Sequence, residues 1–508
     1  MKTPDETAPE RADSGRDVAG TAFAAELSTH LADYGDRPCI EYEQRWYSGA
    51  EFTNAMREID RRLAGAGVPV SARIAVVVRN RVPHAAAVLG SIAGNRPLAV
   101  IDCYQSGAGM GRDIERIRPG AVIAAAEDWT APVVDACART GCAGLVLSPA
   151  LGDVRIIAER DSGVIADPVG DVPGLHLLTS GTTGPPRRIP IPTAALAHTV
   201  ATMTGGATAA PDDPPELVHW PFGSVGICQL LAAPFLGKRM VLLEKFDVAQ
   251  WVRAVRTYRI RRTGVQPAIL RMLLEADVPR ADLASLEYLP GGSGPLEPEL
   301  REEFERRYGI PLLWAYGATE FAGSVCAWTP ELHRRFGAEK AGSAGRPLPG
   351  VDVRIVDPDT GDELAADEQG LLEASVAVLG PDWVRTGDLA SVDSDGFITI
   401  HGRGDGAINR GGFKILPETV RAVLLAHPAV RDACVVGVPD PRLGHVPFAA
   451  VETRHGSPAP TEDELRRAVR DALPSHHVPV AIAVVDRLPR NAALKAKIDD
   501  VAALYRRD

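Results

Sequence analysis

The segment richest in side chains that could carry chemistry is Thr179 to Arg188, which reads TSGTTGPPRR and follows the mostly apolar run Leu175 to Leu178. Glycines let backbone N–H groups approach an anion closely, hydroxyls donate hydrogen bonds, and guanidinium groups supply positive charge. This composition favours the binding of phosphate groups, with an ordinary polar loop as the alternative. The segment is not a Walker A loop, because Pro186 and Arg187 stand where that pattern needs glycine and lysine.

A second glycine-rich segment, Gly402 to Ala407, formally matches the dinucleotide-binding pattern G-x-G-x-x-A and follows the strand-like run Phe397 to His401. That pattern requires a helix directly after the glycines, so that the N-terminus of the helix faces a pyrophosphate. Gly411 and Gly412 follow too soon for a helix of useful length to begin there. We therefore exclude a Rossmann-type site in this segment.

A third segment, Tyr316 to Glu320, combines an aromatic ring, a hydroxyl and a carboxylate. Apolar residues recur every four positions from Leu296 to Tyr308, which predicts a helix that ends at Gly309 before a strand over Ile310 to Ala315. The segment then lies at the carboxyl end of a strand, where ligands collect in open α/β sheets. The alternative is a plain turn between a strand and a helix.

The elements that must position these segments are predicted from hydrophobic periodicity. Phe52, Met56, Ile59 and Leu63 indicate an amphipathic helix, a strand is expected over residues 73–79, and a further helix follows from about His84. Short apolar runs recur after it, as a mostly parallel sheet requires. They are residues 98–102, 121–124 and 144–147. The fold class of the first part is therefore α/β.

The pattern changes from about Asp405 onward. Thr461 to Glu464 forms a capping-box pattern, and Leu465, Val469 and Leu473 follow on one helical face, with a strand-like run over Ala433 to Val438. We expect a small α+β domain here. The predicted organisation is a disordered tail over residues 1–17, a large multi-layer domain over 18–404, and a small mobile domain over 405–508.

Composition limits the classes of function. The 508 residues carry a formal net charge of -11, and aromatic residues, which make up 5%, do not alternate with basic runs, so a nucleic-acid partner is not expected. No apolar run reaches the roughly 20 residues of a membrane span, and the acidic start lacks the apolar stretch of a signal peptide. We expect no membrane partner and a cytoplasmic location.

Seven scattered cysteines without Cys-x-x-Cys spacing indicate buried, reduced thiols.

Taken together, the segments resemble the superfamily of adenylate-forming enzymes, which includes acyl-CoA synthetases, adenylation domains of peptide synthetases, and luciferases. Seven stretches match in the order that this superfamily uses, and together they cover most of the chain. They are TSGTTG at 179–184, GGSGPL at 291–296, YGATE at 316–320, GRP at 345–347, RTGDL at 385–389, Gly402-Arg403 with Asp405, and INRGGFKILP at 408–417.

The resemblance implies an enzyme that joins a carboxylate to AMP using ATP and Mg²⁺ and then rotates a C-terminal domain so that a thiol attacks the acyl-adenylate. It assigns the ATP phosphates to Thr179, Ser180, Gly181, Thr182, Thr183 and Gly184. It assigns the adenine slot to Gly292, Ser293, Gly294, Tyr316 and Gly317. These roles suit the residue types, since a tyrosine ring stacks on a purine.

The same resemblance assigns the remaining nucleotide contacts. Thr319 would bond the α-phosphate, and Glu320 would hold Mg²⁺, for which a carboxylate is a suitable hard oxygen ligand. Asp388 would accept hydrogen bonds from both ribose hydroxyls, and Arg403 would bond ribose or phosphate close by. Asp405 stands at the hinge, where a few backbone torsions absorb the domain rotation. A salt-bridged surface carboxylate is the alternative for Glu320, and an ordinary loop aspartate is the alternative for Asp405.

For thioester formation, Gly411 and Gly412 resemble the loop that lines the pantetheine tunnel, where the lack of a Cβ keeps the passage open. The run from Ile408 to Gly412 is more similar to the acyl-CoA synthetase branch, so free coenzyme A is the favoured thiol acceptor. The catalytic lysine is assigned to Lys495, with Lys497 as the rival in register and a surface lysine as the alternative. Its ammonium would bridge the carboxylate and the α-phosphate.

Three departures from the family pattern bear on activity. Arg188 replaces a glycine in the phosphate loop and cannot adopt glycine torsions cheaply; Leu494 replaces the glycine before the catalytic lysine; and Gly223 and Ser224 replace an aromatic residue and a histidine that wall the acyl pocket. The first two predict slow or absent adenylation with intact thioester formation. The function that the resemblance implies is that of an acyl-CoA ligase acting on a small-molecule carboxylic acid.

Three alternatives remain open at this point. The chain could form the thioester alone, from an acyl-adenylate supplied by a partner adenylating enzyme. It could load a carrier protein in place of free coenzyme A. It could also bind the adenylate without catalysis.

Overall fold

The computed structural model describes residues 13–161, 172–179, 187–204, 209–210, 212–223, 225–318, 321, 323–404, 406–410, 413–440, 443–491 and 494–505. Its largest sheet has seven strands in the order β7-β6-β5-β3-β4-β8-β9. The five inner strands pair in parallel, and the two edge strands are antiparallel. Their bounds are β3 Ile74–Val78, β4 Pro97–Asp102, β5 Ala121–Ala125, β6 Ala143–Leu147, β7 Val154–Ala158, β8 Gly174–Thr179 and β9 Arg187–Pro192.

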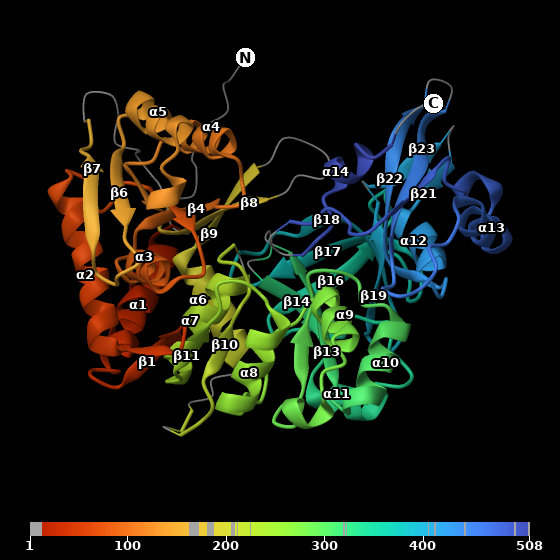
Figure 1. Cartoon of the computed structure of the whole chain (residues 1–508), viewed down its shortest axis with the longest axis horizontal. Coiled ribbons are helices and arrows are strands. Elements are labelled where there is room, and N and C mark those ends of the chain that lie inside the picture. Colours follow the sequence, from red (N-terminus) through yellow and green to blue (C-terminus); the bar gives the residue numbers. More distant parts are fainter. Residues whose placement is uncertain are drawn as a thin grey trace, which may run out of the picture.

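Helices cover both faces of this sheet (Figure 1). On β3, Ala75 and Val77 face α4 (Gly107–Ile117) and α5 (Ala131–Thr140), whereas Ile74 and Val76 face the opposite core. This alternation follows from the two-residue period of a strand, and burial on both faces accounts for the unbroken apolar runs. The opposite core is formed with α1 Asp13–Ala32, α2 Gly49–Gly65, α3 Val82–Ala93, α6 Thr193–Thr204 and α7 Val225–Leu236.

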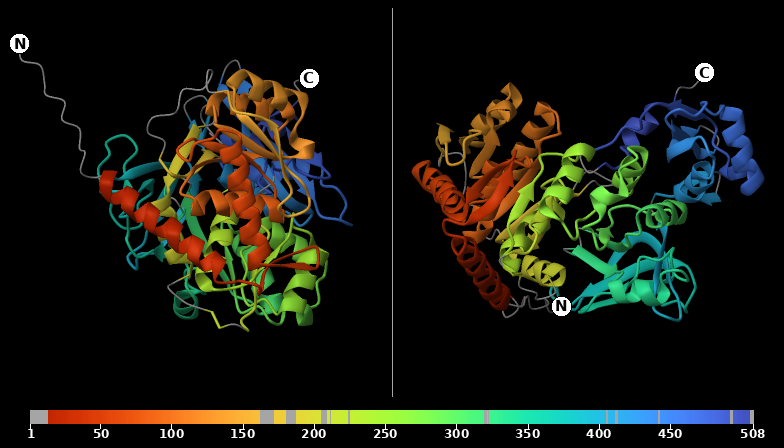
Figure 2. Two further views of the ribbon diagram at one scale, coloured as in Figure 1. Left: turned by 90° about the vertical axis from the view of Figure 1, so that its left-hand side faces the viewer. Right: turned by 60° about the horizontal axis from the view of Figure 1, so that its bottom comes forward.

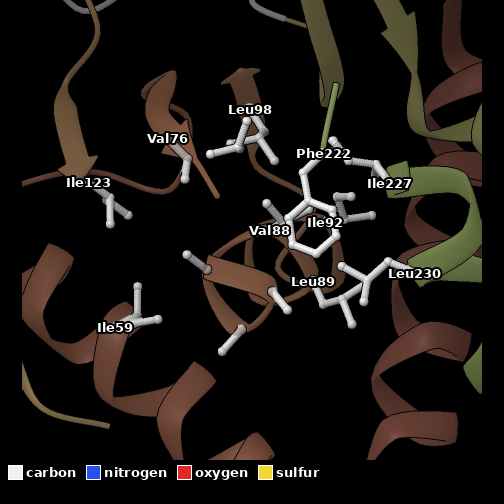
Figure 3. Packing of buried hydrophobic residues seen from close by; sticks show 14 of the residues in the cluster. Ile59, Val76, Val88, Leu89, Ile92, Leu98, Ile123, Phe222, Ile227 and Leu230 are labelled. Carbon is white, nitrogen blue, oxygen red and sulfur yellow. The ribbon is translucent and has the colours of Figure 1, made fainter. Parts of the chain in front are cut away.

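Figure 3 shows how that core is filled. Phe222 and Leu230 reach it from the segment around α7, and Val88 and Leu89 reach it from α3. Each of these side chains is almost completely buried. Leu175, Leu177 and Ile191 of β8 and β9 belong to the same core, so the two strands that flank the predicted phosphate loop are anchored on a densely packed layer.

The rest of the large domain adds three four-stranded sheets and four helices. The first sheet has the order β10 (Glu216–Val218), β11 (Met240–Leu242), β1 (Pro38–Tyr42) and β2 (Arg45–Ser48). The second has the order β12 (Leu289–Gly291), β13 (Leu312–Ala318), β14 (Gly323–Ala327) and β15 (Arg346–Pro347). The third is antiparallel, with β16 (Val351–Val356), β17 (Gly370–Val376), β18 (Val384–Val392) and β19 (Ile398–Arg403). The helices are α8 Val248–Tyr258, α9 Pro267–Glu275, α10 Pro298–Tyr308 and α11 Pro330–Phe336.

The C-terminal part lies at one end of the molecule, beside α9, α10 and the third sheet (Figures 1 and 2). Its sheet has the order β21 (Phe413–Ile415), β20 (Ile408–Arg410), β23 (Gly444–Thr453) and β22 (Val430–Asp440), with β24 (Ile482–Val485) parallel to β23. Its helices are α12 Pro417–Leu425, α13 Glu462–Ala472 and α14 Ile498–Ala502. It has its own buried cores, which begin at Ile408.

Local predictions agree with these elements in most places. The helix that ends at Gly309 and the capping box at Thr461 are both present. The strand expected over 310–315 is present with shifted bounds, since β13 begins at Leu312 and extends to Ala318. Helix α1 begins at Asp13, so the last five residues assigned to the tail, 13–17, are helical. The domain boundary at residue 404 remains a prediction.

The predictions for the Gly402 segment, the cysteines and membrane spans can also be compared with the structure. Strand β19 ends at Arg403 and β20 begins at Ile408, so the described residues between Gly402 and Arg410 include no helix. All seven cysteines are free thiols; five are buried as predicted, whereas Cys103 and Cys228 are half-buried. Across the described ranges, no helix is both long and apolar enough to cross a membrane.

Candidate functional site

The residues predicted to form an adenine slot lie at one edge of the second sheet. Strands β12 and β13 are parallel neighbours, so Gly292 to Gly294 leave one strand where Tyr316 and Gly317 end the other. Parallel strands bring their carboxyl ends to the same edge, as the prediction for Tyr316 assumed. The two segments are therefore brought together.

The glycine loop is held tightly against β13. A Cβ at Gly291 would lie 2.0 Å from the Trp314 ring, and one at Gly292 would lie 3.0 Å from the Ala315 carbonyl oxygen. The Trp314 indole N–H donates to the Gly294 carbonyl oxygen at 2.9 Å. Close backbone approach thus explains Gly291 and Gly292, and Trp314, which sequence reasoning did not identify, fixes the loop at Gly294.

Asp388 and Arg403 face each other on neighbouring strands, because Asp388 of β18 is in register with Arg403 of β19. The Arg403 Nε lies 3.9 Å from Asp388 Oδ1. The Asp388 backbone N–H donates to Thr386 Oγ1 at 3.0 Å, and the Thr386 hydroxyl donates to the Leu372 carbonyl oxygen at 2.9 Å. The carboxylate is therefore well anchored while it keeps acceptor positions for a ligand.

Tyr316 connects the two sheets at this point. Its hydroxyl donates a hydrogen bond to Asp388 Oδ2. Burial, together with the negative charge of Asp388, raises the pKa of Tyr316 above its usual value, so the phenol stays protonated. Tyr316 and Asp388 are 72 positions apart in the sequence, and their contact joins the predicted adenine and ribose contacts into one site.

Lys495 reaches this site from the C-terminal part. It lies in a tight turn closed by the pairing of Arg490 with Ala496, in which the Asn491 N–H donates to the Lys495 carbonyl oxygen at 2.8 Å. The Lys495 N–H donates to Asn491 Oδ1 at 3.0 Å. Desolvation lowers the pKa of Lys495, and the charge of Asp388 acts against this lowering. The ammonium of Lys495 is thus within electrostatic reach of the Asp388 carboxylate.

The rival lysine has a different environment. The Lys497 ammonium lies 3.2 Å from Asp500 Oδ2 in an ion pair in which both side chains are about half exposed. This pair occurs at the start of α14 and resembles ordinary surface i,i+3 pairs, which contribute little to stability. The geometry therefore favours Lys495 for a role in the site.

Arg188 and Leu494, which both replace a glycine of the family pattern, differ in backbone conformation. Arg188 lies in the extended strand β9 and pairs with Leu178, so its backbone needs no glycine torsions, and that part of the prediction is wrong. Leu494 does adopt a left-handed φ of 59°, the region that glycine enters at no cost. Its side chain packs against the core formed around α9 and α10.

The Arg188 side chain also has a structural partner that the sequence did not reveal. Its guanidinium donates to the carbonyl oxygens of Val100 at 2.9 Å and His176 at 2.7 Å, and to Asp113 Oδ2 of α4 at 2.7 Å. Both charged side chains are mostly buried. Arg188 therefore ties β9 to β8, β4 and α4, and it does not have an uncommitted guanidinium for a phosphate.

Several predicted residues lie outside the described part of the chain. They are Ser180, Gly181, Thr182, Thr183, Gly184, Thr319, Glu320, Asp405, Gly411 and Gly412, with Ser224 of the acyl wall. Thr179 is the last residue of β8. Within the described ranges, no group of three potential ligands could hold a metal ion.

Comparison with known proteins agrees with this architecture. The family model for AMP-binding enzymes matches residues 27–376, and the model for the C-terminal domain of AMP-binding enzymes matches 420–495. A 2-succinylbenzoate–CoA ligase of Bacillus licheniformis is 32% identical over 355 residues, which are 65% of this chain and 71% of the relative. An indoleacetate–CoA ligase of Aromatoleum aromaticum is 32% identical over 373 residues, which are 69% and 71%.

The fold is shared with solved structures. The crystal structure of ATP-bound MatB from Rhodopseudomonas palustris aligns with a TM-score of 0.79 at 23% identity, and the alignment covers 95% of this chain and 99% of MatB. The family matches cover both parts of the chain, and the relatives are acyl-CoA ligases. The chain therefore belongs to the family of AMP-binding, adenylate-forming enzymes, in its acyl-CoA synthetase branch.

Proposed function

We propose that this protein is an ATP-dependent acyl-CoA ligase that works through an acyl-adenylate. In the first half-reaction, an oxygen of the substrate carboxylate attacks the α-phosphorus of ATP, and pyrophosphate leaves. In the second, the thiolate of coenzyme A attacks the acyl carbonyl carbon, and AMP leaves. The observation that carries this proposal is the polar site at Asp388, since the hydrogen bond from Tyr316 and the nearby Arg403 bring three motifs of the family together in space.

The roles of the described residues follow from their chemistry. Asp388 accepts hydrogen bonds from the ribose hydroxyls, with Tyr316 holding one carboxylate oxygen and Arg403 standing near the other. Gly292 to Gly294 form the floor of the adenine slot. Lys495 stabilises the negative charge that develops between the carboxylate and the α-phosphate.

The remaining assignments rest on the sequence alone. Thr179 to Gly184 hold the phosphates, Thr319 bonds the α-phosphate, and Glu320 would hold Mg²⁺. Asp405 is the hinge between a large domain over 18–404 and a mobile domain over 405–508, and Gly411 and Gly412 line the passage for pantetheine. Free coenzyme A and ATP are abundant in the cytoplasm, and the free thiols of the chain suit that reducing compartment, so we place the enzyme there.

The structure bears on whether adenylation is impaired. The strand conformation of Arg188 removes one of the two reasons for expecting a defect, while the strained backbone at Leu494 keeps the other. We therefore favour the complete two-step ligase over an enzyme that performs thioester formation alone. Aryl-substituted carboxylic acids, the class to which 2-succinylbenzoate and indoleacetate belong, are the first substrates to test.

The test is a panel of such acids assayed in two ways. Acid-dependent pyrophosphate release from ATP reports the first half-reaction, and acyl-CoA formation from a supplied acyl-adenylate reports the second. We expect Lys495→Ala to abolish the first and to spare the second, while the matched control Lys497→Ala leaves both intact. Loss of pyrophosphate release in Lys497→Ala alone would contradict the assignment of Lys495.

The same panel separates the alternatives. Thioester formation without pyrophosphate release indicates an enzyme that depends on a partner adenylating enzyme. Transfer to a phosphopantetheinylated carrier protein, but not to free coenzyme A, indicates a loading enzyme. Thermal stabilisation by AMP or acyl-adenylates without any turnover indicates a binding protein.

A further inference from the structure

A buried network of charges joins the two parts of the chain behind the Lys495 turn. We call it the interdomain ion network and define it by five residues. They are Arg271 and Glu297 of the large domain, and Arg421, Asp432 and Arg490 of the C-terminal part. All five side chains are between 6% and 23% exposed, so their interactions are only weakly screened by solvent.

Two contacts in this network cross between the domains. Glu297, at the N-terminus of α10, lies 2.7 Å from the Arg271 guanidinium and 2.8 Å from the Arg421 guanidinium. Asp432 of β22 lies 2.8 Å from Arg421 and 3.7 Å from Arg271. The two carboxylates therefore alternate with two guanidinium groups across the interface.

Burial alone would raise the pKa of Asp432, but the surrounding guanidinium groups of Arg271, Arg421 and Arg490 hold it well below its usual range. The carboxylate is thus ionised at every physiological pH. An ionised carboxylate that is 6% exposed requires its cationic partners, because an unpaired buried charge is strongly destabilising. When the C-terminal part leaves this position, the Asp432 carboxylate loses its ion pair with the Arg271 guanidinium.

Arg490 connects this network to the turn that carries Lys495. One terminal nitrogen of its guanidinium pairs with Asp432 and lies 3.4 Å from Glu452 Oε2. The other donates to the carbonyl oxygen of Leu494 at 2.9 Å. The planar fork of an arginine makes both contacts at once, so its orientation on Asp432 fixes the position of the Leu494 carbonyl.

That carbonyl belongs to the residue with the left-handed backbone, directly before the lysine. A left-handed leucine is costly and persists only when its surroundings hold it in place. We propose that Arg490 is a positioning residue for Lys495, and that the interdomain ion network orients Arg490 so that seating the C-terminal domain also sets the lysine turn. This proposal rests on the proposed function of Lys495 in adenylation.

The central experiment compares Arg490→Met with wild type in the two half-reactions, using the acid of the panel that wild type activates best. We expect acid-dependent pyrophosphate release to fall at least tenfold through kcat, with the KM for ATP within threefold. Acyl-CoA formation from supplied acyl-adenylate should stay within twofold. Equal loss in both half-reactions, or no loss in either, would overturn the proposal.

A second readout needs no substrate. Acetylation of Lys495 by N-hydroxysulfosuccinimide acetate, followed across pH by mass spectrometry, reports how solvated its amine is. In Arg490→Met we expect the midpoint to move to higher pH by about half a pH unit or more, because a released ammonium is better hydrated. An unchanged midpoint at Lys495, with Lys497 as the internal reference, would overturn the positioning role.

Two further variants complete the design. Arg454→Met is the matched control, since Arg454 lies in the same part of the chain and donates its Nε to the Val430 carbonyl oxygen at 3.1 Å; it should change neither readout. Arg490→Lys keeps the charge beside Asp432 but cannot span both contacts. It should shift the acetylation midpoint in the same direction as Arg490→Met, and it decides the question if the methionine variant does not fold.

The outcomes distinguish this inference from the proposed function. If wild type releases no pyrophosphate with any acid, the proposed function fails, while the acetylation profile still tests whether Arg490 positions Lys495. If wild type is active and Arg490→Met behaves as wild type in both readouts, the inference fails alone.

Discussion

Replacing Asp113 tests whether Arg188 stabilises the seven-stranded sheet or binds a phosphate group. Asp113 Oδ2 lies 2.7 Å from the Arg188 guanidinium, with the two side chains 7% and 13% exposed. Removing one partner of a buried ion pair costs about 3–5 kcal/mol, because the other charge is left uncompensated. Arg188 would keep its bonds to the carbonyl oxygens of Val100 and His176. We therefore expect Asp113→Ala to lose about 3 kcal/mol of unfolding free energy.

The assay is urea unfolding followed by tryptophan fluorescence and circular dichroism. The same helix offers a matched control, since Glu115 of α4 forms an exposed pair with Arg139 at 2.7 Å. Exposed pairs of this kind contribute about 0.2–1 kcal/mol, so Glu115→Ala should change little. The double variant Asp113→Ala/Arg188→Met should recover much of the loss, because no buried charge is left unpaired.

Two results would refute this reasoning. Asp113→Ala with the same stability as Glu115→Ala would show that the pair does not anchor β9. Arg188→Met with native stability but greatly weakened ATP binding would show that Arg188 contacts phosphate, as one interpretation of the TSGTTGPPRR segment allows.

Four other predictions address the site and its surroundings. Asp388→Ala should weaken AMP binding by about 1.5–3 kcal/mol, the value of hydrogen bonds to a charged acceptor, as measured by calorimetry. Asp405→Pro should impair one half-reaction selectively, because proline fixes φ near about −65°; the two-way assay of pyrophosphate release and acyl-CoA formation checks this. Leu494→Gly should keep or raise pyrophosphate release, whereas Leu494→Val should lower it, since a β-branched residue resists a left-handed backbone. Burial lowers the pKa of His84 to about 3. Below about pH 6.5 the unfolded chain therefore binds a proton at this residue that the folded chain does not, and wild type loses stability as the pH falls. Between pH 7 and pH 5, the unfolding free energy of His84→Leu in urea should fall by about 2 kcal/mol less than that of wild type.

Each of these four has an outcome that contradicts it. Unchanged AMP affinity in a folded Asp388→Ala variant would reject the ribose contact, and equal loss in both half-reactions would reject Asp405 as the pivot. Faster pyrophosphate release in Leu494→Val than in Leu494→Gly would show that the left-handed backbone is not limiting. Identical acid sensitivity of wild type and His84→Leu would show that His84 does not titrate with unfolding.

Much of the architecture could be predicted because it depends on local patterns. The apolar runs at Ile74 to Val78 and Ala121 to Ala125 carry the signature of strands buried on both faces. Gly309 ends α10 with φ of 72°, as the helix-stop signal indicates. The antiparallel sheet β16–β19 was not predicted beyond the strand-like run Phe397 to His401, since most of its strands lack an unbroken buried apolar run and its pairing joins separate segments.

The candidate site shows the same difference between local patterns, which can be predicted, and contacts between distant residues, which cannot. Motif resemblance assigned Tyr316, Asp388 and Lys495 to the site, and these assignments remain predictions. No local pattern indicated that Tyr316 bonds Asp388 or that Arg490 bonds the Leu494 carbonyl. Arg188 shows the opposite error, because the family pattern suggested a glycine torsion where the chain forms a strand. A single sequence does not predict contacts between distant elements or the backbone torsions that those contacts set.

The register of β18 against β19 has a thermodynamic consequence for the two parts of the chain. Arg403, which pairs with Asp388, is the last residue of the large domain's final strand and precedes the proposed pivot by two positions. If a nucleotide on Asp388 favours one domain orientation by a given factor, that orientation must favour the nucleotide by the same factor, because coupling free energies are reciprocal. The ratio of the AMP affinities of wild type and of a domain-locked variant therefore reports the orientational equilibrium, without observing the rotation itself.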